Sequence, residues 1–253
     1  MATAIPECAP TVSFALTGLE CKDALERLIT GALQEARRSL GVNADIAVAI
    51  TCAEDGSNYE LHPEEARALS PRVRLLRRLQ WSLGRAAAHT ALRKVGVTEP
   101  GPIIPGNMRE PIWPAGMTGS VTHCYPWSVA VAGRSSGRFS IGIDLESVDR
   151  IGQTDISSVV CRRAERDWVG APGDSRMRLC MIFSAKEALY KSLYPVCRRY
   201  IDFQEAELSW HAERSCFYAG LIGTVKHVPG RLSTIPLKRY HNLIFSCSIC
   251  EKH

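Results

Sequence analysis

A strict alternation of apolar and polar side chains over residues 139–146 constrains the fold of this chain more than any other feature. The stretch reads FSIGIDLE. Successive side chains of a β-strand point to opposite faces, so this period of two predicts a strand with one apolar face. On the other face Asp144 and Glu146 would lie about 6–7 Å apart. Two such carboxylates suit a hard cation such as Mg²⁺, although polar residues also alternate on a solvent-exposed face.

Helical and strand patterns are interspersed along the rest of the chain. Apolar residues at three- and four-residue spacing predict helices over residues 22–40, 71–95, 161–169, 174–182 and 185–194. Strands are predicted at residues 44–51, 127–133, 206–212, 216–222 and 242–249. Ser70 and Pro71 favour a helix start, and a short turn would join strand 127–133 to strand 139–146 as a hairpin. The fold class expected is α/β (α+β), with two lobes, residues 1–136 and 137–253.

Basic side chains are concentrated in the predicted helix 71–95 and just before it. The residues are Arg67, Arg72, Arg74, Arg77, Arg78, Arg85, Arg93 and Lys94. At 100° per residue, Arg74, Arg78 and Arg85 would project within about 40° of one another. A guanidinium fits phosphate well, so this side could bind an anionic ligand, or it could be an ordinary solvent-exposed face. The net charge of only +5 favours a local anion site over attraction by the whole surface.

Two further candidates for an anion site follow this helix. Arg109 lies in the Pro- and Gly-rich residues 99–119, which predict a long loop with a functional or connecting role. His123 precedes the strand 127–133, although a lone histidine at a strand end is more often structural.

The segment FSAKEALYK, residues 183–191, places charge in a stretch otherwise built like a buried helix. Ser184 and Glu187 have the spacing of a capping box, and Lys191 lies one turn after Glu187. Glu187 is also the natural third carboxylate beside Asp144 and Glu146 if the helix packs on that strand. Three carboxylates alone would repel one another, and a metal ion would remove that repulsion.

The cysteine pattern and the N-terminus favour a cytoplasmic protein. The ten cysteines are scattered, which predicts reduced thiols. Cys247 and Cys250 form a C-x-x-C, but no second pair completes a zinc site. The first twenty residues lack a basic region, so no signal peptide is expected. The uncharged residues 111–133 contain several prolines and glycines, which does not favour a membrane span.

These signals occur together in the order of a known family. Arg77 and Arg85 as R-x7-R, then REPIWPAGMTGSVTHC, IGIDLE and FSAKEALYK, resemble the two-lobed phosphopantetheinyl transferases, in particular the branch that serves siderophore and broad carrier-protein activation. The resemblance covers about residues 70 to 225. It implies two similar α/β lobes related by a pseudo-two-fold, with the cofactor in the cleft between them.

The resemblance also implies a role for each candidate residue. Asp144, Glu146 and Glu187 would be the Mg²⁺ ligands. Glu187, directly or through a water, would accept the proton of a carrier serine. Lys191 and Lys186 would face the phosphates of coenzyme A, with Lys191 catalytic beside Glu187. The nucleotide end would be held by Arg77, Arg85, Arg109, Thr122 and His123.

The implied reaction transfers 4'-phosphopantetheine from coenzyme A to a serine of an acidic apo carrier protein. A monomer is expected, because one chain holds both lobes, with no nucleic acid or membrane as partner. One alternative is a Mg²⁺-dependent phosphoesterase or nuclease, which would also use clustered carboxylates. Another is a non-enzymatic nucleic-acid binder that uses the basic residues 67–94.

Overall fold

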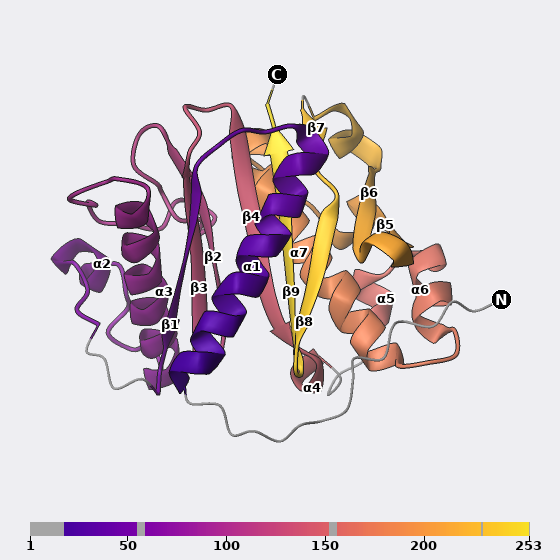
Figure 1. Ribbon diagram of the computed structural model, residues 1–253, viewed down its shortest axis with the longest axis horizontal. Helices are drawn as coiled ribbons and strands as arrows, with labels where there is room; N and C mark the ends of the chain where they lie inside the picture. Colours follow the sequence, from indigo (N-terminus) through magenta and orange to yellow (C-terminus); the bar gives the residue numbers. More distant parts are fainter. Residues whose placement is uncertain (1–17, 55–58, 152–155, 229, 253) are drawn as a thin grey trace.

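The computed structural model describes residues 18–54, 59–151, 156–228 and 230–252, in which helices and strands are interspersed (Figure 1). The α-helices are α1 (Gly18–Leu40), α2 (Pro63–Arg67), α3 (Leu75–Lys94), α4 (Val148–Ile151), α5 (Ser157–Val160), α6 (Arg163–Gly170) and α7 (Ser175–Cys197). Three short 3₁₀ helices are η1 (Phe203–Glu205), η2 (Ala212–Arg214) and η3 (Gly223–His227). The strands are β1 (Ile46–Cys52), β2 (Met117–Cys124), β3 (Trp127–Arg134), β4 (Phe139–Ser147), β5 (Ala206–His211), β6 (Cys216–Leu221), β7 (Arg231–Leu232), β8 (Ile235–Tyr240) and β9 (Leu243–Glu251). This mixture of helix and sheet confirms the predicted fold class.

The strands form two sheets of antiparallel pairs that meet at β2 and β4. The first sheet has the order β1-β3-β2, and the second has the order β4-β9-β8-β6-β5, with β7 paired to β9. The hydroxyl groups of Ser120 and Thr122 on β2 accept the backbone N–H groups of Ile143 and Leu145 on β4, each at 3.1 Å. Side chains therefore join the two sheets where a backbone ladder does not.

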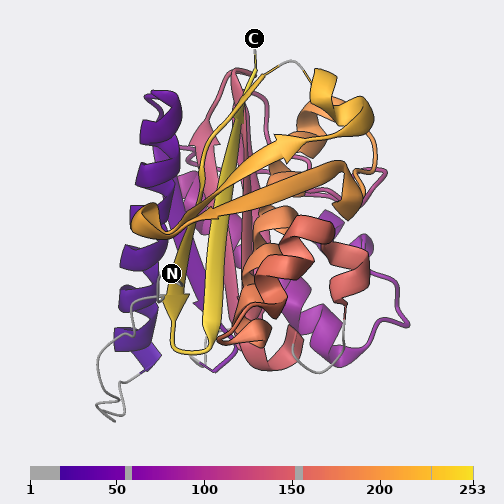
Figure 2. The ribbon, with the colours of Figure 1, turned by 90° about the vertical axis from the view of Figure 1, so that its right-hand side faces the viewer.

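Long helices cover the two sides of this assembly. Helix α1 buries Leu25 and Ile29 in a core shared with Val131 of the first sheet and Ile141 and Phe245 of the second. Figure 2 shows α1 on one side of the strands and α7 on the other. Because α1 contacts strands of both sheets, it fixes one sheet against the other. The predicted division into lobes 1–136 and 137–253 falls in the turn between β3 and β4, and it stays a prediction.

The polar face of β4 is buried against α7 rather than exposed to solvent. Asp144 is 3% exposed, so the alternative of a solvent-exposed polar face is wrong. A glycine at position 142 makes the close approach of α7 possible. A Cβ atom there would lie 2.5 Å from the backbone nitrogen of Ser192 and closer still to the carbonyl oxygen of Ala188.

We expect Gly142→Ala to destabilise the protein, because the new methyl group would meet helix backbone that cannot move alone. The free energy of unfolding should fall by an amount at the upper end of roughly 1–3 kcal/mol, the usual cost of overpacking. Gly31→Ala in α1 is the matched control, since nothing lies within 4 Å of its Cβ position. Urea unfolding of both variants checks this, and equal stabilities would contradict the close packing of β4 on α7.

One strand was missed by the sequence patterns, and one predicted hairpin is wrong. Residues 117–124 form β2, which pairs with β3 across the Tyr125–Pro126 turn. Strand β4 pairs with β9 and not with β3. Alternate residues of β2 are buried, but the buried ones, such as Thr118, Ser120 and Thr122, are small and polar. Their polarity hides the period of two in the sequence.

Two helix starts also differ from those predicted. Helix α7 is continuous from Ser175 to Cys197 and is capped by the Asp174 side chain, which accepts the Met177 N–H at 2.9 Å. Ser184 therefore does not cap a helix, and its hydroxyl contacts that of Ser246 at 2.8 Å. Helix α3 begins at Leu75, after a turn at residues 71–72, rather than at Pro71. The capping-box interpretation of Glu187 is thus wrong.

The cysteines and helices of the described segments carry two simpler findings. No disulfide links cysteines within those segments. Cys247 and Cys250 lie three residues apart on β9, where they are buried in different cores, which does not suit a shared zinc ion. None of the helices among these residues combines the length and the apolar character needed to cross a membrane. Residues 1–17, on which the signal-peptide expectation depends, lie outside the described residues.

Candidate active site

Asp144 lies at the centre of the site, near the end of β4. Its Oδ1 atom accepts two side-chain hydrogen bonds, from the Thr122 hydroxyl at 3.2 Å and from the Lys191 ammonium at 2.7 Å. Its Oδ2 atom is buried and has no hydrogen-bond partner within the described residues. Because a buried carboxylate oxygen without a partner is costly, this atom is suited to a further cation.

Glu146 and Glu187 lie close enough to Asp144 to alter one another's titration. Burial, followed by the charge of Asp144, raises the pKa of Glu146 to about 7, and Glu187 contributes in the same direction. Burial also raises the pKa of Glu187, again with a contribution from Asp144. The structure therefore brings the three predicted carboxylates into one electrostatic neighbourhood, where each disfavours ionisation of the others.

Lys191 is the cation that faces these carboxylates. It lies one turn after Glu187 on α7, and its ammonium also donates to the carbonyl oxygen of Ile143 at 3.1 Å. Burial disfavours the charged form of Lys191, but Asp144 and Glu187 outweigh burial and raise its pKa above the usual range. Lys191 is thus held in the ammonium form, with its charge directed at the end of β4.

The donor set fits a magnesium ion, although the side chains are not in a ready metal geometry. No group of three His, Cys, Asp or Glu side chains in the described segments is arranged to hold a metal. The fit rests instead on chemistry: carboxylate oxygens are the ligands Mg²⁺ prefers, and Asp144 offers an oxygen with no other partner. The assignment of Asp144, Glu146 and Glu187 as ligands stays a prediction.

On the other side of Asp144, α3 and β2 bring Arg77 and His123 together. The Arg77 guanidinium lies 3.3 Å from Nε2 of His123, and since arginine only donates, this nitrogen accepts. Burial, the charge of Arg77 and that of Lys191 lower the pKa of His123 to about 4. His123 is therefore a neutral hydrogen-bonding group at pH 7 in this cationic surrounding.

Arg85 is a second, more deeply buried cation on α3. It is 6% exposed, and its guanidinium carbon lies 4.0 Å from the centroid of the Trp81 ring. Its Nε atom is buried without a hydrogen-bond partner in the described part of the chain. Burial lowers the pKa of Arg85 to about 10, which leaves it charged at neutral pH. A buried charge of this kind is suited to an anionic ligand.

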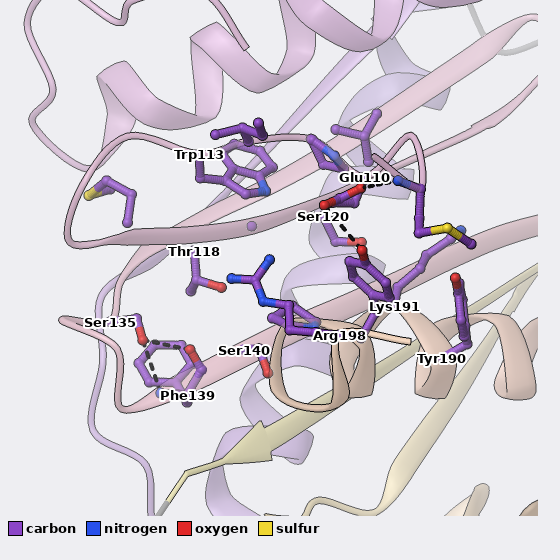
Figure 3. A pocket seen from close by; sticks show the side chains of 18 of the residues that line it. Glu110, Trp113, Thr118, Ser120, Ser135, Phe139, Ser140, Tyr190, Lys191 and Arg198 are labelled. Atoms are coloured by element: carbon purple, nitrogen blue, oxygen red, sulfur yellow. Dashed lines mark hydrogen bonds between the residues drawn. The ribbon is translucent and has the colours of Figure 1, made fainter. Parts of the chain in front are cut away.

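A cavity of about 410 Å³ begins at Lys191 and extends between the first sheet and α7 (Figure 3). Its walls come from residues 108–113, from β2, from the start of β4 and from the C-terminal half of α7. Arg109 lines this cavity from a backbone with φ of 66°. Arg109 is thus separated from Arg77 and Arg85, which do not line it.

Lys186 is not where the resemblance implies, and this prediction is wrong for the structure described. Its side chain is 3% exposed and donates to the carbonyl oxygens of Val160 and Phe203, each at 2.8 Å, and to Glu165 Oε2 at 2.7 Å. All three ammonium hydrogens are used by these partners. Lys186 and Lys191 lie five residues apart, so they project from different sides of α7.

Several residues of the site gave no sequence signal of their own. Glu110 accepts the Tyr194 hydroxyl at 3.3 Å in the cavity wall, and Arg198 lines the same cavity. Trp81 precedes Arg85 by one helical turn, a spacing that could have indicated their contact. The hydroxyl of Thr122 supports Asp144 from a strand that the patterns did not predict.

We expect Thr122→Val to destabilise the protein by roughly 1.5–3 kcal/mol, the usual value for a hydrogen bond to a charged group. The substitution removes the hydroxyl that donates to Asp144 and accepts from the Leu145 amide. Thr122→Ser keeps that hydroxyl and should lose less. Urea unfolding of both variants makes the comparison, and a valine variant as stable as the serine variant would contradict the role of Thr122.

Two family models match the chain. The model described as 4'-phosphopantetheinyl transferase superfamily matches residues 140–240, and the one described as 4'-phosphopantetheinyl transferase N-terminal domain matches residues 64–133. Every residue predicted for the site lies within one of the two matches.

Individual relatives extend over most of the chain. The 4'-phosphopantetheinyl transferase Svp of Streptomyces mobaraensis is 34% identical over 190 residues, which cover 72% of this chain and 74% of that protein. PptT of Mycobacterium tuberculosis, also a 4'-phosphopantetheinyl transferase, is 34% identical, with 69% and 76% covered. Enterobactin synthase component D of Salmonella typhimurium is 37% identical, with 46% and 48% covered.

Solved structures resemble a part of the chain. A holo-(acyl-carrier-protein) synthase from Bacillus anthracis in complex with CoA (3',5'-ADP) gives a TM-score of 0.37 at 18% identity, covering 45% of this chain and 96% of that one. The Chronobacterium ammoniagenes ACPS-CoA complex gives 0.40 at 15% identity, with 46% and 98% covered. Each alignment spans less than half of this chain.

Proposed function

We propose, because the chain belongs to the 4'-phosphopantetheinyl transferase superfamily, that it moves 4'-phosphopantetheine from coenzyme A to a serine of an apo carrier protein and releases 3',5'-ADP. The single observation that best supports this reaction is the buried group around Asp144. It combines an unpartnered carboxylate oxygen, two further acidic groups and the Lys191 ammonium beside a cavity.

The chemical demand of the reaction matches these residues. A neutral serine hydroxyl must attack a phosphorus atom surrounded by anionic oxygens, so the site must reduce charge repulsion and hold the reacting groups in line. Lys191 supplies positive charge to the phosphate as the P–O bond to the nucleotide breaks. Glu187, whose raised pKa makes it a better base than a solvent-exposed glutamate, accepts the serine proton.

The nucleotide end of coenzyme A would be held away from the reacting phosphorus. Arg77, Arg85 and Arg109 offer guanidinium groups to its phosphates, and neutral His123 offers a hydrogen bond. Thr122 acts through Asp144, which it orients. Binding energy from these remote contacts would position the phosphate that reacts.

Asp144, Glu146 and Glu187 would hold Mg²⁺. When bound, the ion would neutralise charge on the pyrophosphate and orient it. The need for a cation follows from the three carboxylates, for which Lys191 is the one ammonium shown to make a direct ion pair with Asp144 in the described residues.

The carrier protein is expected to be acidic, which suits the mild excess of basic residues in this chain. A monomer is proposed because β2, β4, α3 and α7 of one chain together supply every predicted site residue. A cytoplasmic location stays a prediction.

The reaction is tested by following 3',5'-ADP release from coenzyme A by chromatography. The proposal predicts release only when apo carrier protein and Mg²⁺ are both present, with loss of release on adding a chelator. A phosphoesterase would cleave coenzyme A or model phosphodiesters without any carrier. Release that is independent of the carrier would therefore overturn the transferase proposal.

A further inference from the structure

The charge of Arg85 is supported in an uncommon way. The guanidinium is 6% exposed, yet its close contact is the face of an aromatic ring rather than a carboxylate. A buried cation normally needs a partner that offsets the loss of hydration. Glu65 acts on Arg85 through its charge, while no hydrogen bond or ion pair between the two is present among the described residues.

Trp81 provides the surface on which this guanidinium lies. Both residues belong to α3, four positions apart, so their side chains lie over one another on the same face. The indole ring is itself fixed, because its Nε1–H donates to the carbonyl oxygen of Glu65 at 3.2 Å. A ring held at one edge cannot rotate freely beneath Arg85.

Glu65 is in turn one of the most firmly held residues in the described part of the chain. Its side chain is fully buried, and its Oε1 atom accepts from His89 Nε2 and from the backbone N–H of Ile103, each at 2.8 Å. Its Oε2 atom accepts from the backbone N–H of His62 at 3.2 Å. Helix α2 is thereby attached to the middle of α3, at the level of Trp81.

We propose that Trp81 is a positioning residue: its ring, fixed to α2 through Glu65, holds the Arg85 guanidinium ready for a phosphate of coenzyme A. The proposal rests on the proposed function for the identity of the ligand. It assigns no chemical step to Trp81.

An aromatic ring suits this task better than a carboxylate. A carboxylate hydrogen-bonded to Arg85 would neutralise the guanidinium, occupy its N–H donors and repel an incoming phosphate. The ring attracts the cation through its electron-rich face without using a donor. Arg85 therefore keeps its full charge and its donors for the ligand.

Binding affinity, measured by calorimetry, tests the proposal independently of turnover. The probes are coenzyme A and 3'-dephospho-coenzyme A, since the resemblance places Arg85 at the 3'-phosphate. Trp81→Leu is expected to raise the Kd for coenzyme A roughly tenfold, the scale of a desolvated cation–π contact. The Kd for 3'-dephospho-coenzyme A should change less than twofold, and Trp81→Phe should bind coenzyme A nearly as well as wild type.

A purely structural role would give a different result. Trp168, whose ring lies 5.4 Å from the Arg178 guanidinium carbon, provides the control variant Trp168→Leu for the loss of a stacked ring outside the site. If Trp81→Leu weakens both probes equally, or binds coenzyme A as tightly as wild type, the proposal is overturned. Transfer activity is assayed in parallel, so an inactive wild type that still shows the selective Kd change would overturn the proposed function alone.

Discussion

Glu187→Gln is expected to lower the rate of phosphopantetheine transfer by about 10²–10⁴-fold, the usual contribution of a general base. Glutamine keeps the shape of the side chain but cannot accept the serine proton. The loss should appear in kcat, because Glu187 lies beside Asp144 and Lys191 rather than among the arginines expected to bind the nucleotide. Steady-state kinetics with coenzyme A and an apo carrier protein measure both kcat and KM.

The control for this substitution is Glu213→Gln, which changes an exposed glutamate in η2. That variant should transfer at the wild-type rate. Thermal unfolding must show that Glu187→Gln is folded, which is expected because the substitution removes a partly buried charge. A folded Glu187→Gln variant with kcat within threefold of wild type would rule out Glu187 as the base.

Lys186→Met is expected to destabilise the protein by about 3–5 kcal/mol, because breaking a buried pair leaves an uncompensated charge. The partner left behind is Glu165, which is buried and also accepts the backbone N–H of Leu208 at 2.7 Å. The double variant Lys186→Met with Glu165→Gln removes both charges and should recover part of the loss. Urea unfolding of the single and double variants measures the difference.

An exposed pair of the same type provides the comparison. Lys238 and Glu35 form an ion pair at 2.6 Å in which both side chains are partly exposed. Lys238→Met should cost less than about 1 kcal/mol, as surface pairs usually do. If Lys186 contacted a phosphate instead, its substitution would raise the KM for coenzyme A while leaving stability unchanged, and that result would contradict the position described for it.

The fold could be predicted from sequence wherever one face of an element is strongly apolar. The alternation of 139–146 identified β4, and the apolar spacing of 22–40 identified α1 with its end before Gly41, where φ is 71°. Strand β2 was missed because its buried positions are small polar residues that bond to β4 through side chains. Pairing of β4 with β9, about a hundred residues later, has no local signal in the sequence.

The candidate site was predicted where spacing along one element determined proximity. Asp144 and Glu146 share a face of β4 because the period of a strand is two. The position of Lys186 could not be predicted in this way, because its direction depends on α7 beginning ten residues earlier than its neighbouring motif suggested. The support that Thr122 and Trp81 give to other residues depends on contacts between elements, which only the structure contains.

The central claim, that this cleft transfers phosphopantetheine, is tested most directly by the intact mass of an apo carrier protein after incubation with the enzyme, coenzyme A and Mg²⁺. We predict a gain of one phosphopantetheine group with the wild-type protein and no gain with Asp144→Ala. Carriers from fatty acid, polyketide and peptide synthesis should be included, because the partner is not fixed by the site. No gain on any of them, with a folded wild-type protein, would contradict the account.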